Sequence, residues 1–213
     1  GDGSNRTIFN FVSSVATQAF TVSAADNISI VGLRLRGFRV ICNGGSAVCD
    51  GVFVTTTATN SSISQSVFED INIQNPRKGF TRQGVIYMSQ FKGITIGGNV
   101  TAYGFNDQGS LQIIYNKHQN IEVTGVGNGA YAYYVTSAAS QYETLTCDGP
   151  CYFAGAYTSV KGLSVESMTQ SVPPTGMTSV IQLNQIASLE NVAIINVPNA
   201  KYGIGISANG TVT

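Results

Sequence analysis

The stretch Asn120-Ile-Glu-Val-Thr-Gly125 decides the fold of this chain, because the same pattern returns along its whole length. It consists of a turn-forming residue, an apolar residue, any residue and a second apolar residue. Five other segments share it, beginning at Asn27, Ser62, Gly93, Gly162 and Asn191. The first apolar residues lie 35, 31, 27, 42 and 29 residues apart. We interpret the longest separation as an inserted loop around residues 129–151. A repeat of this period predicts a solenoid.

The first position of the pattern predicts a sharp corner in each coil. It is Asn, Ser or Gly, and Asn and Gly tolerate a left-handed backbone. A second short strand precedes each corner, so the unit is strand, turn, strand and a looser return. One such unit cannot bury its apolar face alone, and stacking units in register buries it. The predicted corner residues are Asn27, Ser62, Gly93, Asn120, Gly162 and Asn191.

The two apolar positions of each repeat should point into the solenoid, because alternate side chains of a strand share one face. The predicted core residues are Ile28, Ile30, Ile94, Ile96, Ile121, Val123, Leu163, Val165, Val192 and Ile194.

Composition agrees with an all-β chain and excludes several classes of protein. Of 213 residues 43% are hydrophobic and only 10% are charged, against about 25% in an ordinary soluble domain. Eleven basic residues balance eleven acidic ones, which argues against nucleic-acid binding. No apolar run approaches the roughly 18 residues of a membrane-spanning helix. The abundance of Gly, Ser, Thr, Asn, Val and Ile favours short strands and turns over helices.

These repeats resemble the right-handed parallel β-helix of the pectate-lyase-like superfamily, which includes pectinases, phage tailspikes and surface adhesins. The Asn or Gly corner is similar to the Asn-ladder turn of that superfamily, and the opening residues 1–11 resemble its first coil. The resemblance implies one all-β domain over residues 1–213, a single-stranded right-handed parallel β-helix of about six to seven coils. It names a fold, which does not by itself give a function.

The four cysteines form two local pairs, Cys42 with Cys49 and Cys147 with Cys151. Neither spacing is that of a zinc site. Two pairs of buried thiols are one alternative, and two disulfides are the other. We predict both disulfides, one of which closes the loop 42–49, and with them an oxidising compartment.

Five Asn-x-Ser/Thr sequons favour a secreted glycoprotein. They begin at Asn5, Asn27, Asn60, Asn99 and Asn209. At Asn27 the sequon coincides with a predicted corner, where a buried and hydrogen-bonded amide would not accept a glycan. Asn60, Asn99 and Asn209 fall in turn-like segments and are the better acceptors.

Catalytic signals are missing. The strings typical of polygalacturonase-type hydrolases, Asn-Thr-Asp, Asp-Asp, Gly-His-Gly and Arg-Ile-Lys, do not occur. The single histidine, His118, precedes the Asn120 corner and is interpreted as a surface or turn residue. The neighbouring acids Glu69 and Asp70 would point to opposite faces of a strand, so they cannot act as the paired carboxylates of a glycosidase. The sequence therefore predicts no catalytic, cofactor-binding or metal-binding residue and no cofactor.

Basic residues gather in two places. Arg77 and Lys78, with Arg82, have the chemistry to hold an acidic glycan, but we interpret them as part of a solvated loop. Arg34, Arg36 and Arg39 alternate with apolar residues, so two of them should share an outer face. That face would bind an anionic ligand or a subunit, or would only solubilise the strand.

Tyrosines are concentrated in the second half of the chain. In Tyr131-Ala-Tyr-Tyr134, alternation predicts Tyr131 and Tyr133 on one face and Tyr134 on the other. With Tyr142, Tyr152 and Tyr157 they either pack in the core or form an aromatic platform for sugars or for a protein partner.

The low charge, the disulfides, the sequons and the missing catalytic strings favour a non-catalytic extracellular module with a structural or adhesive role, part of a surface appendage or filament. Neither end of the solenoid resembles a polar cap, which favours self-association, either head to tail or as a homotrimer. The partners expected are further copies of the chain and glycans, without nucleic acid or membrane insertion. The alternative is a polysaccharide-degrading hydrolase or lyase of the tailspike or pectinase kind.

Overall fold

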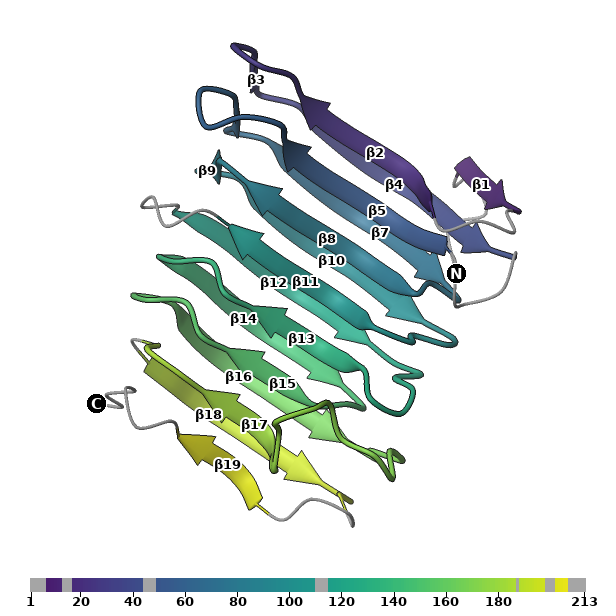
Figure 1. Ribbon diagram of the computed structural model, residues 1–213, viewed down its shortest axis with the longest axis vertical. Helices are drawn as coiled ribbons and strands as arrows, with labels where there is room; N and C mark the ends of the chain where they lie inside the picture. The colour runs from purple at the N-terminus through teal and green to yellow at the C-terminus, as the bar shows by residue number, and fades with distance from the viewer. Residues whose placement is uncertain are drawn as a thin grey trace.

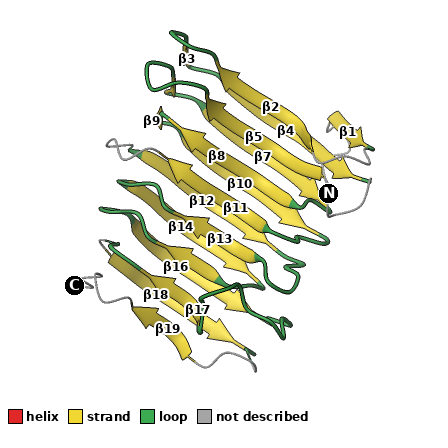
Figure 2. Ribbon diagram, in the orientation of Figure 1, coloured by secondary structure: helices red, strands yellow, loops and turns green. Residues whose placement is uncertain are grey.

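The computed structural model describes residues 7–12, 17–43, 49–109, 115–186, 188–197 and 202–206. These residues form a parallel β-solenoid of about eight coils, whose strands are stacked along the long axis of the molecule (Figure 1). Strands, turns and loops make up this part of the chain (Figure 2). It contains no helix long and apolar enough to cross a membrane. The predicted all-β parallel solenoid is confirmed, with more coils than the six or seven expected.

Three parallel sheets are built from the described strands. The first, sheet A, contains β1 (Thr7–Phe11), β4 (Arg34–Cys42), β7 (Val67–Gln74), β10 (Gln90–Gly97), β12 (Asn116–Val123), β14 (Ser140–Cys147), β16 (Ser159–Glu166) and β18 (Ser188–Ile195). Sheet B contains β2 (Thr17–Ala24), β5 (Cys49–Thr56), β8 (Lys78–Gly84), β11 (Tyr103–Gly109), β13 (Tyr131–Val135), β15 (Cys151–Phe153), β17 (Ser179–Leu183) and β19 (Tyr202–Ile206). A third, short sheet contains β3 (Ser29–Val31), β6 (Ser62–Ser64) and β9 (Ile86–Tyr87).

The 42-residue separation between Ile121 and Leu163 holds an additional coil and not an inserted loop. Residues 131–135 form β13 and residues 140–147 form β14. Leu145 of β14 pairs with Ile121 on one side and with Leu163 on the other. The corner residue before Leu145 is Thr144, so the repeat lacks the Asn or Gly that would have revealed it.

The corner column of sheet A is one residue wide and left-handed in backbone conformation. Gly93, Asn120, Gly162 and Asn191 occupy it with φ values of 61°, 52°, 70° and 53°. In the earlier coils the column continues through Gly37 and Asp70, so the prediction of Asn27 and Ser62 there is wrong. Their segments start the short strands β3 and β6 instead. Gly37-Phe-Arg-Val and Asp70-Ile-Asn-Ile fit the same sequence pattern, which therefore matched twice in those coils.

The core lies between sheets A and B and is filled by columns of apolar side chains. Ile94, Ile96, Ile121, Val123, Leu163 and Val165 are buried as predicted. Ile30, Val192 and Ile194 are partly buried and pack against this core. Ile28 is 50% exposed because it lies in the turn before β3, which corrects its predicted core position.

Small residues let the two sheets approach each other along one column of sheet B. Gly51, Gly79 and Gly104 occupy neighbouring coils, and the next coil has Ala132. A Cβ on Gly51 would lie 2.5 Å from Ile73 and 2.6 Å from the carbonyl of Gly79. The two sheets therefore approach each other too closely at Gly51 for a side chain.

Candidate functional site

An aromatic column runs through the core along sheet A, and His118 is one of its members. Phe91 and Phe68 stack with centroids 4.9 Å apart. His118 then stacks on Phe91 at 4.8 Å and on Tyr142 at 4.2 Å, with interplanar angles of 9° and 7°. The strand register places these residues directly opposite one another on β7, β10, β12 and β14. His118 is completely buried, so its prediction as a surface or turn residue is wrong.

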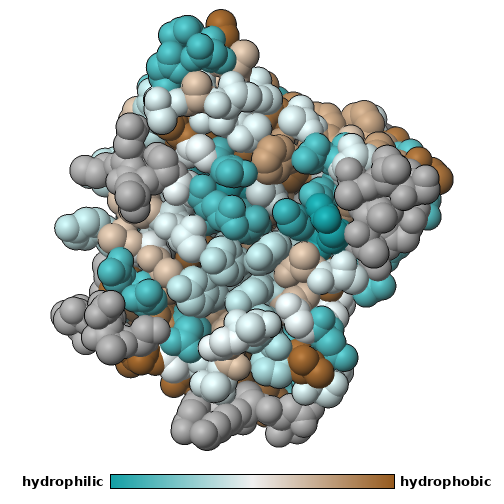
Figure 3. Space-filling model, in the orientation of Figure 1, coloured by the Kyte–Doolittle hydropathy of each residue, from teal (hydrophilic) through white to brown (hydrophobic). Residues whose placement is uncertain are grey.

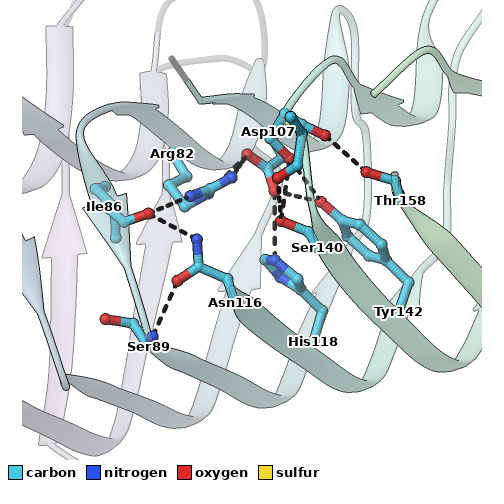
Figure 4. Close-up of polar contacts among 11 residues, drawn as sticks. Arg82, Ile86, Ser89, Asp107, Asn116, His118, Ser140, Tyr142 and Thr158 are labelled. Atoms are coloured by element: carbon cyan, nitrogen blue, oxygen red, sulfur yellow. Dashed lines mark hydrogen bonds and ion pairs between the residues drawn. The ribbon is translucent and has the colours of Figure 1, made fainter. Parts of the chain in front are cut away.

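Asp107 of β11 is the centre of a polar cluster beside this column. Figure 4 shows Arg82, His118 and Tyr142 converging on its carboxylate. Arg82 Nε donates to Oδ1 at 2.6 Å, and the Tyr142 hydroxyl donates to Oδ2. His118 Nε2 lies 3.3 Å from Oδ2. All four side chains are fully or almost fully buried.

The cluster continues toward the short third sheet. Arg82 Nη1 donates to the carbonyl of Ile86 at 3.1 Å, and Asn116 Nδ2 donates to the same carbonyl at 2.7 Å. Asn116 Oδ1 accepts from the backbone N–H of Ser89 at 2.9 Å. These bonds satisfy polar groups that the interior would otherwise leave unpaired, which is the condition for burying them.

The charge in this cluster is balanced by one ion pair, Arg82 with Asp107. Burial lowers the pKa of His118 from 6.5 to about 3, against the opposing effect of Asp107 and with a contribution from Arg82. The imidazole is therefore neutral near pH 7. Burial and the neighbouring carboxylate of Asp107 raise the pKa of Tyr142 well above its usual value, so its hydroxyl stays a proton donor.

A substrate cannot reach these groups, since their side chains are not exposed. Asp107, His118 and Tyr142 have the residue types of an acid–base site, but the arrangement they form here holds coils together. The prediction of a solvated loop at Arg77, Lys78 and Arg82 is wrong for Arg82, whereas Arg77 and Lys78 are partly exposed at the turn that leads into β8. Arg82 is buried, and Arg77 is held by Asp50, with a 2.7 Å contact from Nε to Oδ1.

The exposed counterpart of the core column is a group of four tyrosines on sheet B, here called the tyrosine surface: Tyr103, Tyr131, Tyr134 and Tyr152. Each is half-buried. Tyr103 stacks on Tyr131 at 5.7 Å, and Tyr134 stacks on Tyr152 at 5.1 Å. The two stacks meet edge to face, with Tyr131 and Tyr134 5.1 Å apart at 68°. Lys78 Nζ lies 5.9 Å from the centre of the Tyr103 ring, within cation–π range.

The structure corrects the predicted faces of these tyrosines. Tyr133 is buried in the core, whereas Tyr131 and Tyr134 both belong to the outer face. Strict alternation fails because the N–H groups of Ala132 and Tyr133 both point to the carbonyl of Pro150, at 2.8 and 3.4 Å. β13 keeps an unbroken register with β11, so the backbone bends at Ala132 without an inserted residue.

A loop over residues 167–178, here called the strap, borders the tyrosine surface and makes a groove with it. The groove has a volume of about 280 Å³ and is lined by Tyr131, Tyr134, Tyr152, Thr175, Gly176, Met177 and Gln182. The strap is fastened at Asn128, whose Oδ1 accepts from the N–H groups of Ser171 and Val172 at 3.0 and 3.3 Å. Gln170 Nε2 adds bonds to two backbone carbonyls.

The lining of this groove is uncharged. Burial and the neighbouring tyrosines raise the pKa of Tyr131 and of Tyr134 above the usual value near 10. Their hydroxyls are therefore protonated at neutral pH and are available as donors and acceptors. The surface combines aromatic area with hydroxyl groups, the combination typical of protein contacts and of sugar binding.

The other predicted polar residues lie apart from the tyrosine surface. Arg34 and Arg36 are exposed on one outer face of β4, and Arg39, beyond the Gly37 corner, donates to Asn72 at 3.0 Å. Glu69 contacts Lys92 at 2.9 Å, whereas Asp70 is an exposed corner residue.

One of the two predicted disulfides is formed. Cys42 and Cys49 are bonded, while Cys147 and Cys151 are two buried thiols whose sulfurs lie 3.4 Å apart. The second bond predicted from the sequence is thus not present in this structure. Both cysteines lie in the core beside Tyr133, where burial, followed by the neighbouring Cys147, raises the pKa of Cys151.

Three sequon asparagines are exposed: Asn27, Asn60 and Asn99. The predicted burial of Asn27 is wrong, because it lies in the exposed turn before β3, although its backbone is left-handed as expected of a corner, with φ at 60°. Its Oδ1 accepts from Asn60 Nδ2 at 2.6 Å, so the two sequons lie side by side on successive coils. Asn5 and Asn209 fall outside the described residues.

A scan against protein-family models and a search of curated proteins each found no match to this chain.

Proposed function

We propose that this chain is a non-catalytic extracellular solenoid with a structural or adhesive role, and that the tyrosine surface is its contact face. The observation that supports this most is the position of four half-exposed tyrosines in the middle of a parallel sheet. Tyrosine is enriched in protein contacts because it offers a large ring and a hydroxyl at a small cost in side-chain entropy. The four tyrosines make none of the contacts described for the buried cluster around Asp107, so that cluster does not explain their presence.

The surroundings of the surface suit a specific contact more than non-specific hydrophobic adhesion. Hydrophilic and intermediate residues cover most of the face seen in Figure 3, and strongly hydrophobic residues form separate spots toward its rim. A face of this kind stays soluble when unpaired. The partner we propose is a further copy of the chain, associated side by side.

Sedimentation velocity tests this contact. We expect the native chain to associate with increasing concentration, and Tyr134→Ala and Tyr152→Ala to weaken the association. Tyr87→Ala, on the third sheet, is the matched control and should leave it unchanged. Association that persists unchanged in both surface variants would rule out the tyrosine surface as the contact.

We also propose that the chain belongs to the pectate-lyase-like superfamily. The parallel coils and the left-handed corner column support this membership. That resemblance is also the support for the alternative function, polysaccharide cleavage. Incubation with neutral and acidic polysaccharides, followed by measurement of new reducing ends or unsaturated products, separates the two. Turnover of any of them would replace the structural role with an enzymatic one.

A further inference from the structure

A second cavity lies on another part of the solenoid, at the turns that lead into sheet A. It has a volume of about 460 Å³ and is lined by Tyr115, Asn116, Lys117, Ala139, Gln141, Tyr157 and Ser159. It shares no residue with the tyrosine surface or its groove. What it does is therefore a separate question from the proposed self-association.

The strand register explains how these residues come together. Lys117, Gln141 and Ser159 lie directly opposite one another on β12, β14 and β16. The residues two positions before them in the sequence are Tyr115, Ala139 and Tyr157. The cavity thus has a column of Tyr, Ala and Tyr beside a row of Lys, Gln and Ser.

The alanine makes the space. Adjacent coils are about 4.8 Å apart, so the two tyrosines project from coils about 9.6 Å apart, with only a methyl group between them. Both rings are open to solvent, at 68% and 80% exposure. Exposure of this degree leaves most of the area of each ring available to a ligand.

Tyr157 is held in an unusual conformation for a bulky residue, with φ at 59°. Gln65, Met88 and Ala139 have the same left-handed backbone at the equivalent position of their coils, so the stacked turns impose this conformation on Tyr157. Ala139 has φ at 49°, and its N–H donates to the carbonyl of Ala156 at 2.8 Å. The neighbouring turns are thereby fixed to each other, which fixes the spacing of the column.

The width of the slot selects the ligand. Carbon atoms in contact lie about 3.5–4.0 Å apart, so a flat aromatic ring between two tyrosines fills about 7–8 Å. A pyranose chair is thicker, because it has axial C–H groups on both faces. When all its hydroxyls are equatorial, both faces are apolar and the hydroxyls form a polar rim. That rim would face Lys117, Gln141 and Ser159.

We propose that the slot between Tyr115 and Tyr157 binds a pyranose ring with equatorial hydroxyls, of the β-glucoside type. The rings of the two tyrosines cover the two faces of the sugar. The row of Lys117, Gln141 and Ser159 bonds its hydroxyls on one side, and the open side admits the rest of a glycan chain.

Saturation-transfer NMR with methyl β-D-glucopyranoside tests the sandwich. Saturation is expected at H1, H3 and H5 on one face and at H2 and H4 on the other. Methyl β-D-mannopyranoside, which differs from this ligand only in its axial 2-hydroxyl, should bind at least about tenfold more weakly, which equals about 1.4 kcal/mol. Saturation limited to one face, or tighter binding of 4-methylphenol, would contradict the sandwich.

Variants then locate the site by calorimetry with cellotetraose. Tyr115→Ala and Tyr157→Ala should each weaken binding about tenfold. Ala139→Phe should abolish it by filling the slot while both tyrosines remain. Circular dichroism checks that the variants are folded, and Tyr87→Ala and Tyr152→Ala serve as controls with native affinity. Native affinity in Ala139→Phe, or no binding of either glucoside by the native chain, would overturn the proposal.

Discussion

The imidazole of His118 lies flat on the ring of Tyr142, with centroids 4.2 Å apart and an angle of 7° between the planes. The contact links two neighbouring coils, β12 and β14, at a position that is apolar in most other coils. A neutral imidazole can replace an aromatic ring there because the core does not require it to be charged.

Replacing His118 with Phe keeps the stacking and removes a titrating group. Folded His118 has a pKa of about 3, against about 6.5 when unfolded. The unfolded chain therefore takes up a proton as the pH falls below about 6.5, and the folded chain resists it until about pH 3. The contribution of neutral His118 to stability is therefore fully present above about pH 6.5. It is lost as the pH falls from about 6.5 to about 3, by up to about 1.4 kcal/mol per pH unit.

At pH 7 we expect the free energy of unfolding of His118→Phe to lie within about 1 kcal/mol of that of the native chain. At pH 5 we expect it to be higher than that of the native chain by about 2 kcal/mol. Denaturant titrations at the two pH values measure this difference. Parallel pH dependence of the two proteins would show that the fold does not lower the pKa of His118.

Arg82 and Asp107 stabilise the fold only when both are present, because either charge alone would be buried without a partner. Arg82→Met should cost about 3–5 kcal/mol, because it leaves a buried carboxylate without its cation. Adding Asp107→Asn removes the charge, and the double variant should recover part of the loss. Thermal unfolding of the native chain and of the three variants measures the coupling. A double variant less stable than Arg82→Met alone would contradict the proposed charge pairing of Arg82 with Asp107.

Thr144 is the β-branched member of the corner column, with φ at 57°. Asn tolerates this conformation better, so Thr144→Asn should stabilise the fold by about 1 kcal/mol and raise Tm. Thr146→Asn on the same strand is the matched control, since its backbone is not left-handed, and it should bring no gain. Equal effects of the two substitutions would place the corner elsewhere.

Cys147 and Cys151 are buried thiols next to each other, and their reactivity should report the fold. We consider protein in which Cys147 and Cys151 are free thiols and the Cys42–Cys49 bond is intact. A thiol reagent should label neither Cys147 nor Cys151 in the native state, and both after unfolding. Exposure to oxidised glutathione tests whether the pair closes, and peptide mapping identifies the bond. Rapid labelling of the folded chain would contradict their burial.

The sequence predicted the parallel solenoid because the corner and the two apolar positions after it recur in register. It missed one coil because Thr144 holds the corner with an unfavourable residue that packing on both sides enforces. It also placed two corners wrongly where the pattern occurs twice within one coil. A local pattern cannot choose between such matches, since pairing with the next coil decides.

The buried cluster was recoverable in part. The residue two positions before each corner is Leu35, Phe68, Phe91, His118, Tyr142, Val160 or Leu189, and apart from His118 the set is apolar or aromatic. That column predicts an inward His118 once the true corners are known. The outward position of both Tyr131 and Tyr134 was not recoverable by alternation, because the backbone bends at Ala132 between them. Glycine or alanine before an aromatic residue, as in Gly79-Phe80, Gly104-Phe105 and Ala132-Tyr133, marks the same bend.

The additional coil sets the register on which both the core cluster and the proposed sugar slot depend. Gln119 of β12 and Glu143 of β14 are direct neighbours, with Nε2 2.8 Å from Oε2. Cysteines placed at both positions should form a disulfide on mild oxidation, since Cα atoms of paired strands lie within the 4.4–6.8 Å range that the bond requires. Cysteines at positions 119 and 141 are offset by two residues along the strand and should not. Peptide mapping of the two double variants is the most direct test: a bond in the first pair alone is the predicted result, and a bond in the second pair alone, or in neither, would contradict the stacked parallel coils.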